Sequence, residues 1–191
     1  MIIYLHGFRS APASLKAQAL GRHMQARGLG DKFWCEQLPV SPAAAVALIE
    51  SAIAANAAGP TPPTLVGSSL GGFYATVLAE RHGLRAAVVN PAVVAPLSLE
   101  PYLGLQSNLY TGETFVFTHG HIDELRALQV PAISQPERYW LLAECGDEVL
   151  DYRHAVNYYA GARQTILPGG DHGFSRWTDY LDEVIAFAGL A

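Results

Sequence analysis

Short apolar segments alternate with longer amphipathic ones along most of the chain. The apolar segments are typical of buried strands and lie at residues 2–5, 33–38, 64–66, 85–90, 139–143 and 164–167. The longer segments favour helices and lie at residues 15–27, 42–55, 73–82, 151–159 and 176–187. Because strands that alternate with helices build βαβ units, the sequence predicts an α/β fold, with a mostly parallel sheet and helices on both of its faces.

Residues 91–137 interrupt this alternation. The segment carries five prolines, and only short helical pieces are expected in it, near residues 99–103 and 122–128. We interpret it as a short cap-like insertion over the end of the sheet that holds the active site, and not as a separate domain. The chain has 191 residues, half of them hydrophobic, so residues 1–191 are expected to form one domain.

The most informative motif is Gly67-Ser68-Ser69-Leu70-Gly71, which matches the pattern Gly-x-Ser-x-Gly. It follows a predicted strand and precedes a predicted helix, which is the setting of a nucleophile elbow, where a serine occupies a sharp and strained turn. The glycines leave room for the strand and the helix to approach each other closely. Ser69 is therefore the predicted nucleophile, because Ser68 is not at the apex of the turn.

A serine hydroxyl needs a base, and in this arrangement the base is a histidine that follows the acid late in the chain. His172 fits, because it lies in a glycine-rich loop just after the last predicted strand. The acid should follow the preceding strand, and we predict that Asp147 orients the histidine. Glu148 and Asp151 are the alternatives, although Asp151 is better placed as the N-cap of the next helix. Asp171 is expected to structure its own loop.

Acyl transfer also needs donors for the oxyanion that forms in the transition state. One donor is expected from the main-chain N–H of Leu70, the residue after the nucleophile. The second should come from a loop after an early strand, and His6-Gly7-Phe8 follows the first one. We predict the N–H of Phe8 as this donor, with Gly7 allowing the backbone to turn toward the site.

The composition argues against several other classes of function. The net charge is −5 and the 12 Lys and Arg residues are scattered, so nucleic acid and anionic membranes are not expected as partners. No apolar stretch has the length and continuity of a membrane span. The first residues lack the basic region and apolar run of a secretory signal. We therefore expect a cytoplasmic protein in which Cys35 and Cys145 are reduced.

The sequence gives little support to cofactor-dependent chemistry. Residues 67–72 lack the Lys-Ser or Lys-Thr pair that completes a phosphate-binding loop. His119 and His121, together with Asp123, suggest a metal site, but no matching further ligand is set nearby. We expect neither a metal nor a cofactor.

Several ordered segments resemble the YqiA-like esterases, a compact bacterial branch of the α/β-hydrolase superfamily. The resemblance extends over nearly the whole chain, and the segments that carry it lie at residues 4–8, 66–72, 74–76, 89–92, 102–104, 110–112, 146–153 and 169–172. It implies a compact α/β-hydrolase fold, hydrolysis of carboxylic esters or acyl thioesters, and a triad at Ser69, Asp147 and His172, the residues that the motifs indicate independently.

The sequence therefore predicts a serine esterase that acts through an acyl-enzyme on a small-molecule acyl ester or thioester. An acyl thioesterase or an amidase with the same triad is the alternative within the same chemistry. From another class, the alternative is a non-catalytic binding protein with this fold. The sequence does not indicate an oligomeric state.

Overall fold

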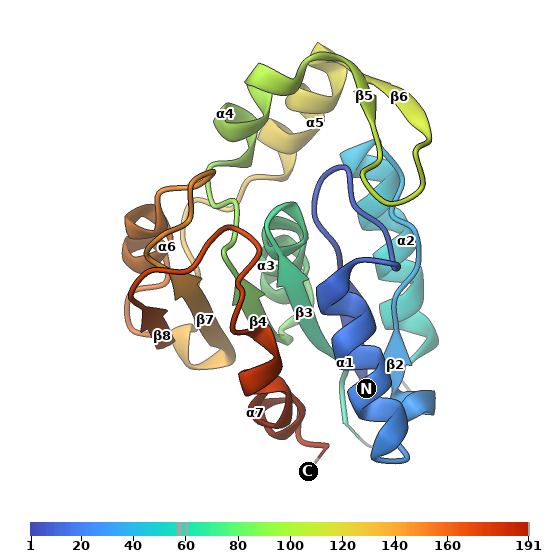
Figure 1. The fold of residues 1–191 in the computed structure, drawn as a ribbon, viewed down its shortest axis with the longest axis vertical. Helices are drawn as coiled ribbons and strands as arrows, with labels where there is room; N and C mark the ends of the chain where they lie inside the picture. Colours follow the sequence, from blue (N-terminus) through green and yellow to red (C-terminus); the bar gives the residue numbers. More distant parts are fainter. Residues whose placement is uncertain (57–58, 60, 191) are drawn as a thin grey trace.

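A six-stranded parallel sheet forms the centre of the computed structural model, which describes residues 1–56, 59 and 61–190 (Figure 1). Its strands are β1 (Ile2–Leu5), β2 (Phe33–Trp34), β3 (Thr64–Ser68), β4 (Arg85–Val89), β7 (Tyr139–Glu144) and β8 (Arg163–Leu167). They lie in the order β2-β1-β3-β4-β7-β8, and every neighbouring pair is parallel. The predicted parallel sheet is confirmed.

Helices cover both faces of this sheet, as predicted. Helices α1 (Leu15–Ala26) and α7 (Leu181–Phe187) pack on one face, and α2 (Pro42–Ala55), α3 (Leu70–His82) and α6 (Tyr152–Tyr158) pack on the other. Successive strand residues point to opposite faces, so Ile3 and Leu5 of β1 join one buried cluster while Ile2 and Tyr4 join the other. The central strands are therefore apolar on both sides.

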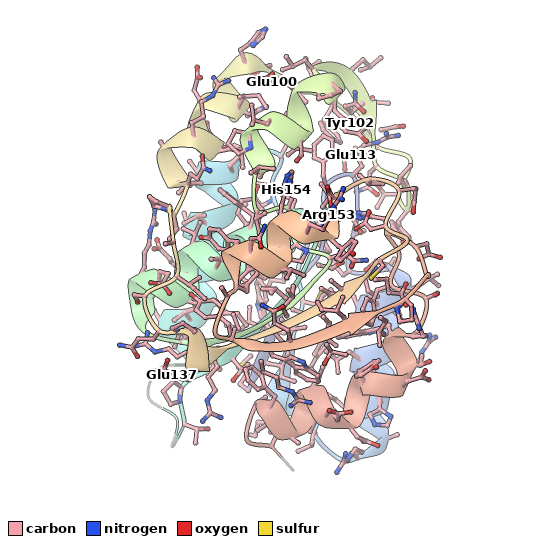
Figure 2. The ribbon with its side chains drawn as sticks, turned by 90° about the vertical axis from the view of Figure 1, so that its left-hand side faces the viewer. Glu100, Tyr102, Glu113, Glu137, Arg153 and His154 are labelled. Atoms are coloured by element: carbon pink, nitrogen blue, oxygen red, sulfur yellow. The ribbon has the colours of Figure 1, made fainter. Side chains whose placement is uncertain are left out.

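The insertion lies at one end of the molecule in Figure 1 and contains α4 (Ala95–Leu99), β5 (Gly104–Ser107), β6 (Thr114–Phe117) and α5 (His119–Leu128). Figure 2 shows Glu100, Tyr102 and Glu113 at that end, whereas Glu137, where the insertion stops, lies near the other end of the sheet. The segment thus crosses from the carboxyl end of β4 to the start of β7. Short 3-10 turns occupy Gly30–Lys32, Glu100–Tyr102, Pro136–Arg138 and Trp177–Tyr180.

The antiparallel pairing of β5 with β6 was not predicted. It depends on a turn in which Asn108 Oδ1 accepts hydrogen bonds from the N–H groups of Tyr110 and Thr111, at 2.9 and 3.1 Å. Gly112 completes the turn with a φ of +74°. A turn closed by a polar side chain does not change the spacing of apolar residues, so that spacing did not predict the hairpin.

Several element boundaries differ from the prediction, and the reason is clearest at β2 and α3. Strand β2 ends at Trp34 and not at residue 38, because the N–H of Leu38 donates to the ring of His6 instead of to a neighbouring strand. Helix α3 begins at Leu70, three residues early, because Ser69 already serves as its N-cap. The last predicted helix is split into a 3-10 turn and α7. Among the described residues, no helix has both the length and the apolar character needed to cross a bilayer.

Candidate active site

Ser69 sits at the sharp turn between β3 and α3. Its φ and ψ are 55° and −120°, in a region that costs energy for any residue with a side chain. Main-chain hydrogen bonds hold it there: its N–H donates to the carbonyl of Val89 at 3.0 Å, and its carbonyl accepts from Gly72 at 2.9 Å and from Ala92 at 3.1 Å. The turn therefore fixes Ser69 from both sides, as a nucleophile elbow requires.

The two glycines of the motif are required by close backbone contacts. A Cβ at Gly67 would overlap the carbonyl of Gly71, and a Cβ at Gly71 would overlap the carbonyl of Leu5 on β1. Helix α3 thus begins in contact with the main chain of β1 and β3. A side chain at either position would therefore displace the elbow.

His172 and Asp147 lie in line with Ser69. The Nε2 atom of His172 is 3.0 Å from the Oγ of Ser69, and its Nδ1 atom is 2.8 Å from Oδ2 of Asp147. Since an ionised carboxylate only accepts, Nδ1 carries the proton and Nε2 is left as the acceptor for the serine hydroxyl. The other oxygen of Asp147 accepts from the N–H groups of Val149 and Leu150 at 2.9 and 2.8 Å. The Asp147 side chain is 2% exposed and that of His172 is 22% exposed, so the pair is shielded but reachable from one side.

Three acidic residues close to Asp147 or His172 in the sequence, Glu148, Asp151 and Asp171, have different positions. Glu148 accepts from the main-chain N–H of His172 at 3.0 Å and does not contact its ring. Asp151 accepts from the N–H of Arg153 at 3.0 Å and is the N-cap of α6, as predicted. Asp171 contributes main-chain groups to its loop. Of the candidate acids, Asp147 is the one that the structure places on the ring.

The loop after β1 lies directly against Ser69, because a Cβ at Gly7 would be 3.2 Å from the Cβ of Ser69. The buried ring of His6 holds this loop: its Nε2 accepts from the N–H of Leu38 at 3.0 Å, which leaves Nδ1 to donate to the carbonyl of Gly7 at 3.0 Å. Burial lowers the pKa of His6, which favours the neutral ring that this pattern needs. Within the described chain, the N–H groups of Phe8 and Leu70 have no hydrogen-bond acceptor.

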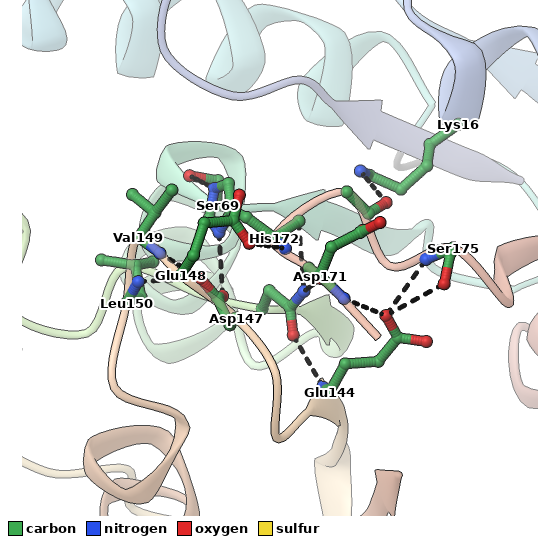
Figure 3. A network of polar contacts seen from close by, with 12 residues as sticks. Lys16, Ser69, Glu144, Asp147, Glu148, Val149, Leu150, Asp171, His172 and Ser175 are labelled. Carbon is green, nitrogen blue, oxygen red and sulfur yellow. Dashed lines mark hydrogen bonds and ion pairs between the residues drawn. The ribbon is translucent and has the colours of Figure 1, made fainter. Parts of the chain in front are cut away.

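Two buried polar residues, Asn90 and Glu144, bind the loop that carries His172, and Figure 3 labels Glu144 beside Asp171 and Ser175 of that loop. Asn90, directly after β4, donates from its amide to the carbonyls of Asp171 and His172 at 3.0 and 3.1 Å. Glu144, the last residue of β7, accepts from the N–H groups of Asp171 and Ser175 at 2.9 and 3.1 Å. The two supports are joined, because Asn90 Oδ1 accepts from the N–H of Glu144 at 3.0 Å. Sequence reasoning assigned a role to neither residue.

The sequence feature that could have identified Glu144 is its position at the end of a strand. It is a charged residue at the end of a run of buried strand residues, and its side chain is completely buried. A buried charge requires partners, and Arg176 supplies one, with Nε 2.8 Å from Oε1. Burial raises the pKa of Glu144, but the bonds from Arg176, Asp171 and Ser175 outweigh burial and hold it below its ordinary value.

Two clefts meet at Ser69 and His172. We call the first, of about 190 Å³, the apolar cleft, because aliphatic and aromatic side chains dominate its wall; they include Phe8, Leu70, Leu99, Tyr102, Val149 and Leu150. The second, of about 220 Å³, is called the polar cleft because it contains Ser10, Ser14, Lys16 and Tyr110. Leu99 and Tyr102 come from the insertion, so residues 91–137 contribute to the wall beside Ser69.

One histidine of the insertion, His121, caps helix α5. His121 Nδ1 accepts from the N–H of Thr118 at 3.1 Å, and the Thr118 hydroxyl accepts in return from the N–H of His121, at the start of α5. In the part of the chain that the structure describes, no three His, Cys, Asp or Glu side chains are close enough together to hold a metal ion. Cys35 and Cys145 are both free thiols.

Comparison with known protein families identifies the family of this chain. The pattern of the family described as Uncharacterised protein family (UPF0227) matches residues 1–189. The chain belongs to this family. UPF0227 is the YqiA family, so this match confirms the resemblance that the sequence motifs indicated.

Solved structures similar to this UPF0227 chain share its architecture at low sequence identity. Alpha/beta hydrolase domain-containing protein 10 from mouse superimposes with a TM-score of 0.71 at 17% identity, over 97% of this chain and 89% of the other. Est1E from Butyrivibrio proteoclasticus, solved with ferulic acid bound, gives 0.69 at 14% identity, over 100% and 89%. A monoacylglycerol lipase from Paleococcus ferrophilus gives 0.67 at 14% identity, over 100% and 94%. These similarities show that the chain has the α/β-hydrolase fold.

Proposed function

We propose that this protein is a serine hydrolase that cleaves carboxylic esters through an acyl-enzyme on Ser69. The observation that carries the proposal is the continuous chain of hydrogen bonds from Ser69 through His172 to Asp147, at 3.0 and 2.8 Å. It lies at the carboxyl edge of a parallel sheet, where α/β folds bind their ligands, and two clefts open onto it. The esterase and lipase named among the similar structures also support this chemistry.

In the first half-reaction, Ser69 Oγ bonds to the ester carbonyl carbon while its proton passes to His172 Nε2. The carbonyl oxygen becomes an oxyanion that accepts from the N–H groups of Phe8 and Leu70, which lack acceptors in the described chain. When the intermediate collapses, the bond to the leaving alcohol breaks and His172 protonates that alcohol. Asp147 stays ionised and stabilises the imidazolium.

In the second half-reaction, water attacks the acyl-serine as His172 takes a proton from it. Collapse of the second intermediate returns that proton to Ser69 and releases the carboxylic acid. No cofactor takes part in either half-reaction. In this proposal the insertion forms a cap over the site, and the apolar cleft, with walls from Leu99 and Tyr102, accepts the acyl chain.

The test is hydrolysis of 4-nitrophenyl esters from acetyl to palmitoyl by wild type and by Ser69→Ala. We expect Ser69→Ala to lose at least about 10³-fold in kcat, because a triad without its nucleophile retains only oxyanion and binding effects. Ser51→Ala is the matched control, since Ser51 lies exposed on α2 and bonds only to the carbonyl of Ala47. A fluorophosphonate should label wild type and Ser51→Ala, but not Ser69→Ala.

The alternatives have separate outcomes. Activity on thioesters or amides alone, lost in Ser69→Ala, would keep the triad and change the substrate class. No turnover of any acyl substrate and no fluorophosphonate adduct would refute the hydrolase and favour a non-catalytic binding protein.

A further inference from the structure

The polar cleft contains a positive charge close to the predicted nucleophile. Lys16 lies in the first turn of α1, and its Nζ donates to the carbonyl of Gly173 at 2.6 Å, one residue after His172. Figure 3 shows the ammonium turned toward the loop that carries His172. An ammonium has three donors, and in the described chain only this one has a protein acceptor.

This position of Lys16 contradicts the usual electrostatics of a helix. The N-terminus of a helix carries a partial positive charge, which acidic residues in the first turn normally offset. The first turn of α1 contains no acidic residue, so the ammonium and the helix terminus reinforce each other. Both lie at the polar cleft, which is lined by Ser14, Leu15 and Lys16. Such a site favours an anion.

The side chain of Ser14 gives a second, independent indication. Ser14 is the N-cap of α1, but its hydroxyl makes no capping bond and has no hydrogen-bond partner in the described chain. The residue is only 6% exposed. Buried hydroxyls are almost always paired, so an unpaired one in the wall of this cleft is available to a polar ligand.

Three carboxylates lie near this positive charge, and among the described residues none of them forms an ion pair with it. Asp147 is occupied by His172, and Glu144 is paired with Arg176 at 2.8 Å. Asp171 is exposed to water and makes no ion pair with Lys16. Burial lowers the pKa of Lys16, and these three carboxylates oppose that effect.

We propose that the polar cleft is an anion subsite, in which Lys16, Ser14 and the N-terminus of α1 bind a carboxylate or phosphate on the alcohol portion of the ester. The inference rests on the proposed function, because it uses Ser69 to define where the ester lies. The apolar cleft suits the acyl chain, which leaves the polar cleft to the alcohol. The substrates are therefore esters whose leaving group is negatively charged.

The test compares two acetyl esters that differ in one charge, 4-acetoxybenzoate and methyl 4-acetoxybenzoate, with acetyl release measured for each. The readout is the ratio of their kcat/KM values, which cancels any loss common to both esters, such as one caused by a shift of Gly173. We expect wild type to prefer the anion and Lys16→Met to reduce this preference by about 10-fold, as for loss of a charge-assisted hydrogen bond. Lys16→Arg should retain most of it.

Lys32→Met is the matched control. It makes the same chemical change at the only other lysine, which is exposed, paired with Asp31 at 2.9 Å and not among the residues that line the polar cleft. The ratio should stay at the wild-type value. If Lys32→Met lowered it as much as Lys16→Met, the preference would come from net charge and the subsite would be refuted.

Ser14→Ala separates binding from a structural role. Because the hydroxyl makes no protein bond, its removal should leave the melting temperature unchanged or raise it, while the ratio falls by about 3-fold or more. A lower melting temperature with an unchanged ratio would show that Ser14 serves only the fold and would overturn its place in the subsite.

Two further esters show which anion binds and on which side of the ester bond it lies. Replacing the carboxylate by phosphate, in 4-acetoxyphenyl phosphate, shows which anion fits better; a Lys16-dependent preference for either supports the subsite. The 4-nitrophenyl monoester of adipic acid carries its charge on the acyl side. If Lys16→Met affected that ester and not 4-acetoxybenzoate, the assignment to the alcohol side would be wrong.

A binding measurement tests the subsite independently of catalytic turnover. Calorimetric titration of wild type with 4-hydroxybenzoate and with inorganic phosphate should detect binding that weakens by about 10-fold in Lys16→Met. Binding of this kind without hydrolysis of any ester would support the subsite and refute the proposed hydrolase. Hydrolysis of both acetyl esters with equal kcat/KM, unaffected at Lys16, would refute the subsite and leave the hydrolase standing.

Discussion

Replacing Glu144 by glutamine tests whether the buried carboxylate holds His172 in place. Glutamine has nearly the same volume but only one accepting oxygen. It can serve either Arg176, which bonds to Oε1, or the N–H groups of Asp171 and Ser175, which bond to Oε2. Its own NH₂ group must then face the other donor. At least one donor loses its acceptor inside the protein.

The expected magnitude follows from burial. Removing one partner of a fully buried ion pair costs about 3–5 kcal/mol. The side chain of Glu144 is 0% exposed but that of Arg176 is 34% exposed, so water screens part of the interaction. We therefore expect Glu144→Gln to lower the free energy of unfolding by about 2–3 kcal/mol. A shift of the loop by about 1 Å would also lower kcat/KM for an ester by about 10²-fold.

The assay is urea unfolding at pH 7, with kcat/KM for 4-nitrophenyl acetate measured on the same preparation. Glu137→Gln is the control, because Glu137 is exposed and makes no ion pair within the described chain. If Glu144→Gln unfolded at the wild-type urea concentration and kept wild-type kcat/KM, the carboxylate would not be what holds the loop.

The same variant predicts a dependence on pH. Because the bonds to Glu144 hold its pKa below the ordinary 4.5, its contribution to stability is complete above that value and is lost as the pH falls through the lower native pKa. The difference in unfolding free energy between wild type and Glu144→Gln should therefore be constant from pH 7 to about pH 5 and shrink in more acidic buffer. A difference that grew on acidification would contradict this reasoning.

Three further substitutions test other parts of the structure. Asp147→Asn should lower kcat by about 10⁴-fold with little loss of stability, because an amide can stabilise the wrong histidine tautomer; steady-state kinetics on an ester measure this. Gly71→Ala should cost about 3 kcal/mol or more in urea unfolding, since its Cβ would overlap the carbonyl of Leu5. Thr76→Val removes the 2.6 Å bond to the buried hydroxyl of Tyr159 and should cost about 1–3 kcal/mol; adding Tyr159→Phe should restore part of that loss.

The sheet could be predicted from the sequence because its strands are buried on both faces. In a chain of this size, apolar runs such as those of β3 and β4 can be buried in few positions other than the centre of a sheet. The elbow could be predicted for a related reason: Gly67, Ser69 and Gly71 satisfy a local backbone constraint, and local constraints appear directly in residue order.

The acid was harder to assign, because Asp147, Glu148 and Asp151 lie within five positions of one another. Spacing does not separate them. The structure does, since one oxygen of Asp147 is held by the N–H groups of its own loop and the other faces His172.

Asn90, Glu144 and Lys16 could not be assigned roles from the sequence. Each acts on the loop that carries His172, and the residues that they contact lie between 27 and 157 positions away in the chain. Contacts over such separations depend on how β4, β7 and α1 are placed, which no local pattern contains.

Asn90, Glu144 and Lys16 contact only the main chain of the stretch from Asp171 to Gly173. Asn90 binds two carbonyls, Glu144 binds two N–H groups, and Lys16 binds the carbonyl of Gly173. The exposed side chains of this loop are therefore free to change while the histidine stays in place. Asp171 adjoins His172 and Gly173, which line the polar cleft, so under the proposed function a different charge at this position would alter the choice of substrate without moving the proposed triad.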